Sequence, residues 1–303
     1  MEKKTARLIK GVGGLYTART AEGETVLCRA KGSFRKEGMR PLPGDFVTVS
    51  PQKEGDALIT EILPRKNALI RPAGANIDRM IFVIAAAKPD PDLYLIDKMT
   101  AVLRHNNIET FLLINKADVA PEKALCLREI YEKAGFKAAV FSAHRAEEYE
   151  TTAIALHEEM RHSVSFFTGA SGVGKSSVIA ELYPEFAEEM KTGTLSEKIE
   201  RGKHTTRKTE LFPIGEDGYI ADTPGFSMLE IARFNLIPKD GLLGAFPDIE
   251  RFSTHCRYSD CTHTKEEGCG VLEAVREGKI ASSRQESFRK LFDELKQTNE
   301  WEK

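Results

Sequence analysis

The sequence has little of what marks a membrane or secreted protein. No run within its 303 residues approaches the roughly 18 apolar residues that a membrane-spanning helix needs. The first residues, MEKKTARLIKGVGG, lack the apolar core of a secretory signal peptide. Only five cysteines are present, and three of them crowd into residues 256–269, unlike the disulfide framework of a secreted domain. These absences predict a soluble cytoplasmic protein with no membrane partner.

An overall basic charge is also missing. The formal net charge of −2 and the pI near 6.4 exclude a protein that is uniformly basic for nucleic-acid binding. The charge is unevenly distributed, however, because residues 1–72 hold seven Lys and seven Arg against eight acidic residues, a formal charge of +6. The sequence therefore predicts a basic module at the N-terminus.

Short strand-like runs fill this basic segment. Gly, Pro and Asp turns separate RLIKGVGGLYTA, ETVLCRA, DFVTVS and ALITEIL. Several short strands at this spacing suit a small closed barrel of the oligonucleotide-binding (OB) kind. A barrel that serves only as a spacer would give the same pattern, and the pattern alone does not separate the two.

From residue 79 the chain alternates between buried strands and helices of 10 to 16 residues. RMIFVIAAA, ETFLLIN, KAAVFSA and SVSFFTG are the predicted strands of this part. This rhythm predicts a parallel sheet covered by helices on both faces. After residue 233 follow a Cys/His cluster and an amphipathic helix, whose apolar stripe we expect to pack on its own domain. The predicted domains are 1–72, 73–232 and 233–303.

A glycine-rich loop links the last of these strands to a helix. Gly169–Ser176 fits the pattern GxxxxGK[ST], in which backbone N–H groups converge on phosphate oxygens at a helix N-terminus. Lys175 is predicted to reach the β and γ phosphates and Ser176 to ligate Mg²⁺. The predicted nucleotide contacts of this loop are Gly169, Ala170, Ser171, Gly172, Val173, Gly174, Lys175, Ser176 and Ser177.

A second phosphate-side motif, DTPG, spans Asp222–Gly225 at the end of another predicted strand. We expect Asp222 to hold a water of the magnesium ion and Gly225 to offer its N–H to a γ-phosphate. Alone the motif is a common turn, but together with the glycine loop it predicts a nucleotide switch.

A base-reading motif, NKAD, follows the strand ETFLLIN. The Asp118 carboxylate can accept from guanine N1–H and the exocyclic amino group together, a pair that adenine does not offer. The Lys116 stem can lie across the base, and Asn115 can tie this segment to the glycine loop. Ser142 and Ala143, at the end of the next strand, are placed to present backbone N–H to the base oxygen O6.

The C-terminal cluster has metal-ligand spacing. Cys256, Cys261, His263 and Cys269 form C-x4-C-x-H-x5-C, a Cys₃His set suited to one tetrahedral Zn²⁺ per chain. In so short a segment, zinc would supply stability that a core cannot. The other two cysteines are most simply core thiols.

These motifs occur in the order base reader, Ser-Ala, phosphate loop and switch, whereas ordinary GTPases begin with the phosphate loop. The sequence resembles the circularly permuted GTPases and, more narrowly, the ribosome small-subunit-dependent GTPase A (RsgA) family, over essentially the whole chain. The resemblance implies a multidomain α/β protein with an N-terminal OB-like β-barrel, a circularly permuted P-loop GTPase domain and a C-terminal zinc-binding helical domain. It also implies a monomeric GTP hydrolase, cycling between GTP and GDP, that acts late in assembly of the 30S subunit and binds its 16S rRNA.

The resemblance extends to the first switch, because RGKHTTRKTE at residues 201–210 is similar to the family's G-[RK]-H-T-T. Thr205 or Thr206 would complete the magnesium shell. Phe226 follows DTPG, where many GTPases place the Gln that orients water, which suggests slow unaided hydrolysis. His204 is the candidate catalytic substitute, although a histidine in this switch could equally contact RNA.

Two other functions fit parts of the pattern. A P-loop kinase acting on a small molecule is disfavoured by Asp118 and by the absence of an obvious lid. An RNA-binding scaffold that holds GTP without turnover would show no hydrolysis in the presence or absence of 30S subunits.

Overall fold

The computed structural model of the chain describes residues 3–36, 38–70, 72–186, 209–222 and 237–301. The chain forms two compact units. Unit 1 comprises Met1–Arg79, Ile154–Thr168 and Ile179–Phe226, and unit 2 comprises Met80–Ala153, Gly169–Val178 and Ser227–Lys303. The predicted domain boundaries after residues 72 and 232 stay predictions. Four predicted site residues lie outside the described residues: His204, Thr205, Thr206 and Gly225.

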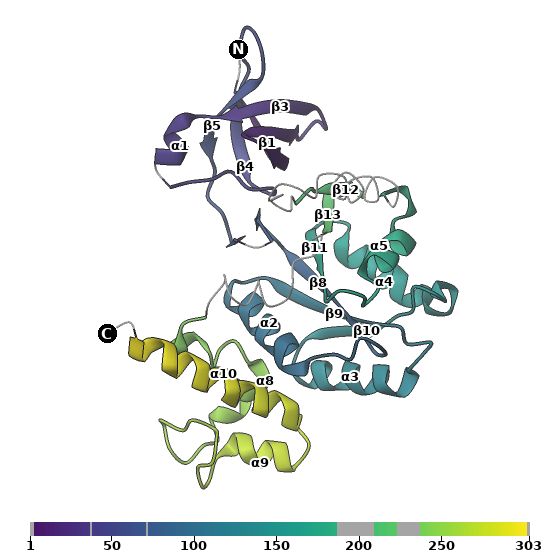
Figure 1. The fold of residues 1–303 in the computed structure, drawn as a ribbon, viewed down its shortest axis with the longest axis vertical. Coiled ribbons are helices and arrows are strands. Elements are labelled where there is room, and N and C mark those ends of the chain that lie inside the picture. Colours follow the sequence, from purple (N-terminus) through teal and green to yellow (C-terminus); the bar gives the residue numbers. More distant parts are fainter. Residues whose placement is uncertain (1–2, 37, 71, 187–208, 223–236, 302–303) are drawn as a thin grey trace, which may run out of the picture. The chain divides into compact units, whose positions relative to one another are not determined.

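A closed five-stranded barrel forms the N-terminal part of unit 1 (Figure 1). Its strands pair in the order β1-β2-β3-β5-β4, with β1 closing on β4. The predicted run RLIKGVGGLYTA divides into two strands because Gly13 and Gly14 adopt φ values of 59° and 87° and turn the chain. The expected OB-like barrel is confirmed. Its elements are β1 (Lys4–Val12), β2 (Leu15–Thr20), β3 (Thr25–Ala30), α1 (Gly32–Lys36), β4 (Phe46–Ser50) and β5 (Ala57–Ile62).

Small and β-branched side chains, together with Leu8 and Phe34, fill the narrow interior of the barrel. Inward positions alternate with outward ones along a strand, and the fully buried residues of β1, such as Ala6 and Leu8, are separated by one less buried position. The buried cluster contains Ala6, Leu8, Ala18, Cys28, Phe34, Val47, Val49, Ala57 and Ile59.

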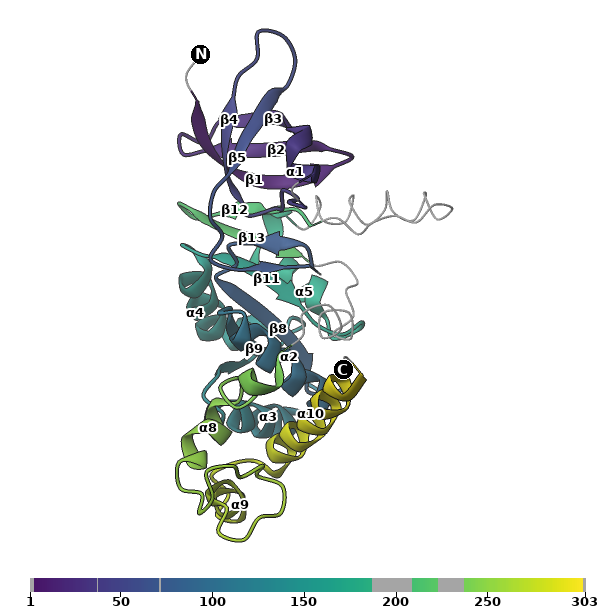
Figure 2. The same ribbon diagram turned by 90° about the vertical axis from the view of Figure 1, so that its left-hand side faces the viewer.

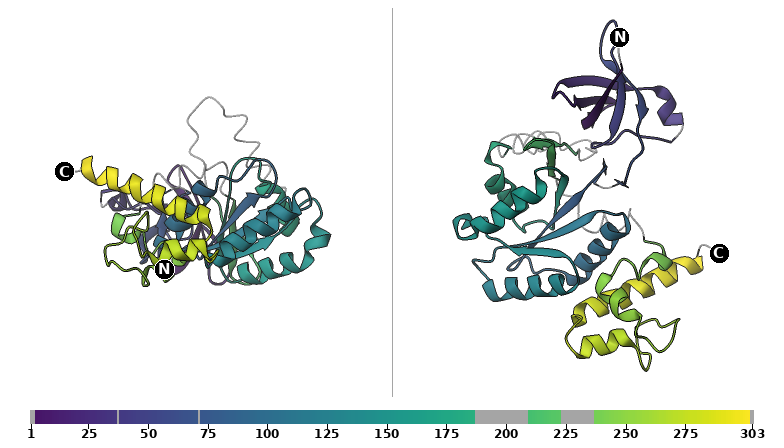
Figure 3. Two further views of the ribbon diagram at one scale, coloured as in Figure 1. Left: turned by 90° about the horizontal axis from the view of Figure 1, so that it is seen from below. Right: turned by 180° about the vertical axis from the view of Figure 1, so that it is seen from behind.

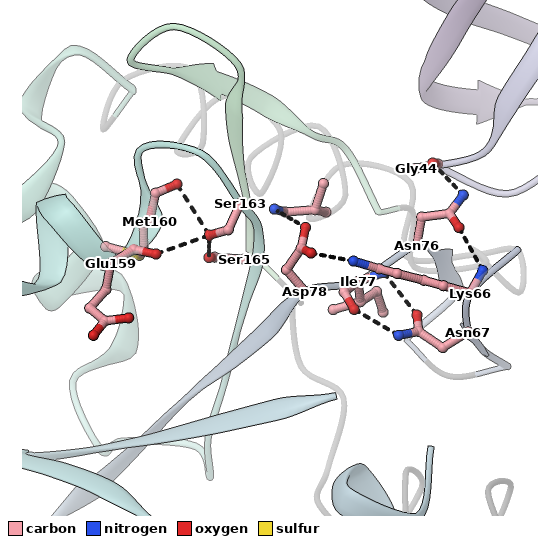
Figure 4. Close-up of polar contacts among 11 residues, drawn as sticks. Gly44, Lys66, Asn67, Asn76, Ile77, Asp78, Glu159, Met160, Ser163 and Ser165 are labelled. Atoms are coloured by element: carbon pink, nitrogen blue, oxygen red, sulfur yellow. Dashed lines mark hydrogen bonds and ion pairs between the residues drawn. The ribbon is translucent and has the colours of Figure 1, made fainter. Parts of the chain in front are cut away.

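A clasp of polar contacts, residues 66–78, follows the barrel and contains the two-residue strands β6 (Ala68–Leu69) and β7 (Gly74–Ala75) (Figure 4). The side chain of Asn67 donates to the carbonyl of Ile77 and accepts from its N–H, both at 2.8 Å. Asn76 donates to the Gly44 carbonyl at 3.1 Å. Because backbone groups of this segment are paired by buried amides, the clasp is a defined structure although its strands are short.

A six-stranded sheet follows, in the order β10-β9-β8-β11-β13-β12 (Figure 1; all but β10 are also labelled in Figure 2). β10 pairs with β9 and β11 with β13, both in parallel, as predicted. The edge strand β12 is antiparallel to β13, because the chain between them is too short for a crossover. The strands are β8 (Arg79–Ala85), β9 (Glu109–Asn115), β10 (Lys137–Val140), β11 (Val164–Thr168), β12 (Phe212–Ile214) and β13 (Gly218–Asp222).

Within unit 1, the chain that enters β12 is attached to the first barrel strand. The Leu211 N–H donates to the carbonyl of Ile9 at 3.0 Å. Beside it, Lys10 and Glu210 form an ion pair of 2.6 Å. These contacts join residues about two hundred positions apart in the sequence. The alternation of apolar and polar residues in the strands does not predict them.

The helices of the sheet are those that the alternating pattern predicted. α3 packs on β9 and β10, and α2 packs on β9. The Asp92 side chain caps the first turn of α2 by accepting from the Leu95 N–H at 3.1 Å. The bounds are α2 (Leu93–His105), α3 (Pro121–Lys133), the 3₁₀ turn η1 (Ala146–Tyr149), α4 (Glu150–Met160) and α5 (Lys175–Leu182).

The C-terminal segment of unit 2 is helical, and its long helix α10 packs on α2. Figure 3 shows α10, coloured yellow, from two further sides. The predicted apolar stripe lies on the inner face, with Phe288 and Leu291 each 3% exposed. Its elements are η2 (Lys239–Gly241), α8 (Pro247–Ser253), α9 (Gly270–Arg276) and α10 (Ser282–Trp301). No helix in the described parts of the chain is long and apolar enough to cross a membrane.

Candidate nucleotide-binding site and metal centre

The glycine loop connects β11 to α5, and two of its glycines admit no side chain. A Cβ atom at Gly169 would lie 2.4 Å from the Val83 carbonyl oxygen. Gly174 has φ of 92°, and a Cβ there would lie 2.4 Å from Nδ2 of Asn115. α5 begins immediately afterwards, so the loop ends at unsatisfied helical N–H groups and the positive end of a helix dipole. This arrangement is suited to binding phosphate.

Asn115 joins three segments of the site. It ends β9, is 2% exposed, and donates from Nδ2 to the Val173 carbonyl at 2.9 Å. Its Oδ1 accepts from the Ala143 N–H at 3.0 Å. One buried amide therefore ties the base-reading segment to both the phosphate loop and the segment after β10. Because the Ala143 N–H is engaged in this way, its predicted role as donor to the base stays a prediction.

Ser142 supports the carboxylate that is predicted to read guanine. Its side chain is fully buried, and Oγ donates to Asp118 Oδ1 at 2.7 Å. The same oxygen accepts from the Arg145 N–H at 3.2 Å, which fixes the hydroxyl rotor. Sequence reasoning assigned only a backbone role to this serine. The sequence does contain a hint of the side-chain role: Ser142 carries a hydroxyl at the end of the strand that follows the NKAD motif.

Lys116 is held between two loops. Its Nζ donates to the carbonyls of Gly172 and Lys88, each at 2.6 Å. The residue adopts φ of 64°, a left-handed backbone conformation that L residues rarely take. With its Nζ held in this way, the Lys116 stem offers apolar methylene groups on which a base could stack. The contact with the Lys88 carbonyl was not foreseen from the sequence.

The remaining predicted phosphate-side residues lie at the ends of their elements. Lys175 and Ser176 are the first two residues of α5, with Lys175 half-buried and Ser176 exposed. Asp222 is the last residue of β13 and pairs in register with Phe167 of β11. Each therefore occupies the carboxyl end of a parallel strand or the helix start that follows it, where ligands of open α/β sheets bind.

The four predicted metal ligands converge. Their donor atoms all lie within 4.8 Å of one another. The Sγ atoms of Cys256 and Cys269 are 3.8 Å apart, and each lies 3.5 to 3.7 Å from His263 Nδ1. A tetrahedron with Zn–S of about 2.3 Å and Zn–N of about 2.0 Å has edges of about 3.8 and 3.5 Å. The Cys₃His set of Cys256, Cys261, His263 and Cys269 thus fits one tetrahedral metal ion.

Neighbouring groups affect both the protonation and the position of His263. Burial lowers the pKa of His263, opposed by the charge of Glu266, and so favours the neutral imidazole that binds metal. Gln285 of α10 donates to the His263 carbonyl at 2.8 Å. The rings of His263 and Phe288 lie 5.8 Å apart. The loop is therefore fixed against α10 by both a hydrogen bond and ring packing.

A buried ion cluster fastens the same helix to its neighbours. Arg284 donates to both carboxylate oxygens of Asp248, at 3.0 and 2.8 Å, and to Asp97 of α2 at 2.8 Å. The side chains of all three are at most 2% exposed. Burial raises the pKa of Asp97, although Arg284 opposes that shift. The cluster joins α2, α8 and α10 within unit 2.

A closed OB-like barrel, together with a sheet in which the base-reading motif precedes the phosphate loop, defines a circularly permuted P-loop nucleotide-binding protein. The profile of the RsgA GTPase family matches residues 62–232, and that of the RsgA N-terminal domain matches residues 5–59. The chain belongs to the RsgA GTPase family, and the class suggested by the order of its motifs is confirmed.

Curated relatives and solved structures agree with this assignment. The "Small ribosomal subunit biogenesis GTPase RsgA" of Caldanaerobacter subterraneus subsp. tengcongensis is 42% identical over 298 residues, covering 98% of this chain and 97% of that protein. The protein of the same name from Agathobacter rectalis is 38% identical over 309 residues, with coverage of 96% and 98%.

Two crystal structures share the fold. YjeQ from Thermotoga maritima has a TM-score of 0.76 at 32% identity, covering 97% of this chain and 99% of that one. YloQ, described as a circularly permuted GTPase, has a TM-score of 0.76 at 26% identity, covering 98% and 96%. The expected fold class and enzyme class are therefore confirmed.

Proposed function

We propose that this GTPase acts in the cytoplasm, as a monomer, in late biogenesis of the small ribosomal subunit. One observation carries the nucleotide assignment: Asp118 is held by Ser142, while Asn115 binds the phosphate loop. A carboxylate fixed beside the loop can accept from guanine N1–H and the exocyclic amino group, whereas adenine does not offer this pair of donors. The relatives that share nearly the whole chain are named small ribosomal subunit biogenesis GTPases, which supports the choice of subunit.

The phosphates of GTP would be held by the backbone N–H groups of the glycine loop. Lys175 would lie against the β and γ phosphates and neutralise charge as water attacks in line. Ser176, Asp222 and one of Thr205 or Thr206 would hold Mg²⁺, which when bound spreads the developing negative charge. His204 would orient the attacking water. Gly225 would donate its N–H to the γ-phosphate.

The outer modules would bind the subunit. Residues 1–72 carry a formal charge of +6 and suit the phosphates of 16S rRNA. The C-terminal cluster would hold one Zn²⁺, since its donor set and its edge lengths match that ion. The central segment 73–232 would link the two and respond to the nucleotide.

Single-turnover hydrolysis of GTP, with and without purified 30S subunits, tests this function. We expect slow basal release of inorganic phosphate and clear stimulation by 30S subunits. Asp118→Asn removes one acceptor and supplies a donor for the C2 carbonyl of xanthine, so GTP binding should weaken by about 2–4 kcal/mol while XTP binding increases. Unchanged GTP affinity in this variant would refute the guanine assignment. Equal rates with and without 30S subunits would refute the ribosomal one.

A further inference from the structure

The metal loop, residues 256–269, carries the four predicted metal ligands. It also contains a carboxylate, Glu266, that is not one of these ligands. Glu266 turns back over residues 262–265, where its Oε1 accepts from the Thr262 N–H at 2.8 Å and also from the Thr262 hydroxyl. Its Oε2 accepts from the N–H groups of Thr264 at 2.9 Å and Lys265 at 3.0 Å. Four donors from three residues, Thr262, Thr264 and Lys265, thus converge on one side chain.

The residue enclosed by these donors is a metal ligand. His263 lies between Thr262 and Thr264 and adopts φ of 58°, a left-handed conformation that L side chains rarely take. Because the N–H groups on both sides of it bind one carboxylate, the backbone of His263 is held in that conformation. Gln285 fixes the carbonyl of the same residue at 2.8 Å. Cys261 directly precedes this anchored stretch, so two of the four ligands depend on it.

We propose that Glu266 is a positioning residue for the metal centre: it holds the loop in the shape that brings Cys261 and His263 together before the ion arrives. This inference rests on the metal centre proposed above. Glu266 itself contributes no ligand, since its oxygens are occupied by the four donors. Groups that orient metal ligands in this way typically change metal affinity by about 10- to 100-fold when they are altered.

The chemistry of the contact requires a carboxylate. Each oxygen accepts two hydrogen bonds, and an amide in the same place would have only one acceptor. In Glu266→Gln the NH₂ group would face backbone N–H donors, so that half of the contact would become repulsive. Glu267 provides a matched control, since it is exposed and Glu267→Gln removes the same charge one position away.

The test is metal affinity in the full-length protein, measured by competition for Zn²⁺ with a chromophoric chelator. Titration with Co²⁺ adds the absorption spectrum of the Cys₃His set. We expect Glu266→Gln to bind Zn²⁺ about 10- to 100-fold more weakly and to release it faster, with the Co²⁺ spectrum unchanged in position because the ligands remain. Glu267→Gln should match the wild type. Thr262→Val removes one of the four donors and should weaken binding in the same direction by a smaller factor, which provides a second test if Glu266→Gln does not fold.

Wild-type affinity and release rate in both Glu266→Gln and Thr262→Val would overturn the proposal. Equal losses in Glu266→Gln and Glu267→Gln would also overturn it, because a general charge effect would then explain the result. If the wild-type protein takes up no Zn²⁺, the metal centre itself is wrong. That outcome is distinct from a wild-type protein that binds the ion without help from Glu266.

Discussion

Removal of Arg284 is expected to destabilise unit 2 strongly. In Arg284→Met the aliphatic stem is largely retained while three hydrogen bonds to Asp97 and Asp248 are lost. Both carboxylates are at most 2% exposed, so water cannot replace the guanidinium. Removing one member of a buried ion cluster leaves uncompensated charge and costs about 3–5 kcal/mol. We expect a loss of this size at neutral pH.

The loss should depend on pH in a defined direction. Burial already raises the pKa of Asp97 in the wild type, and Arg284 is the main group opposing that shift. Without Arg284 the pKa of Asp97 rises further above its value of about 3.9 in the unfolded chain. The folded variant therefore binds more protons than the unfolded one, and its relative stability increases as the pH falls towards the unfolded value. The difference from wild type should be largest above the folded-state pKa and should shrink under acid conditions.

Chemical denaturation followed by fluorescence, with hydrogen exchange of α2 and α10, measures this effect. Arg289→Met, at an exposed position of the same helix, is the control. Adding Asp248→Asn to Arg284→Met should restore part of the stability, because one buried charge is removed. A loss in Arg284→Met no greater than in Arg289→Met, or no recovery in the double variant, would refute the reasoning.

Three further outcomes are expected. Asn67→Ala leaves two buried backbone groups of the clasp unpaired and should lower the free energy of unfolding of unit 1 by about 2–4 kcal/mol in a urea titration; no change would show that water replaces the amide. Gly174→Ala places a Cβ 2.4 Å from Asn115 Nδ2 and should abolish GTP binding in a calorimetric titration, whereas Gly32→Ala, with no atom within 4 Å, should bind normally. The expectation of a core thiol holds for Cys28, which is buried, but is wrong for Cys126, which is exposed on α3. In the metal-loaded protein a chromogenic thiol reagent should therefore label only Cys126 quickly, and chelation should release the three cluster cysteines; rapid labelling of four thiols before chelation would contradict a bound metal.

The sequence predicted the features that depend on local patterns. Strand and helix alternation, the glycine loop before α5 and the spacing of the four metal ligands are each encoded within a few consecutive residues. Side-chain contacts between distant segments were not predicted. Ser142 and Asp118 are 24 residues apart in the sequence, and Arg284 and Asp97 are 187 residues apart. The periodicity of apolar residues carries no information about such pairs.

Two other contacts were missed for a different reason. The Lys88 carbonyl that holds Lys116 belongs to the backbone, and every residue carries such a group, so residue type carries no information about it. Glu266 is local to the metal loop, but an acidic residue beside cysteines is indistinguishable in sequence from a solvated charge. Only the structure shows that four hydrogen-bond donors converge on its carboxylate.

The attachment of β1 to the segment entering β12 has a consequence for how the protein is made. Ile9 is synthesised before its partner Leu211, which follows about two hundred residues later. The barrel strands lie within residues 4–62, so the barrel closes from an early part of the nascent chain. The contact with Leu211 has to wait until most of the chain has been translated, and contacts of such high sequence separation form slowly. During translation the Ile9 carbonyl and the Lys10 side chain therefore lack these partners until residues 210 and 211 have been made.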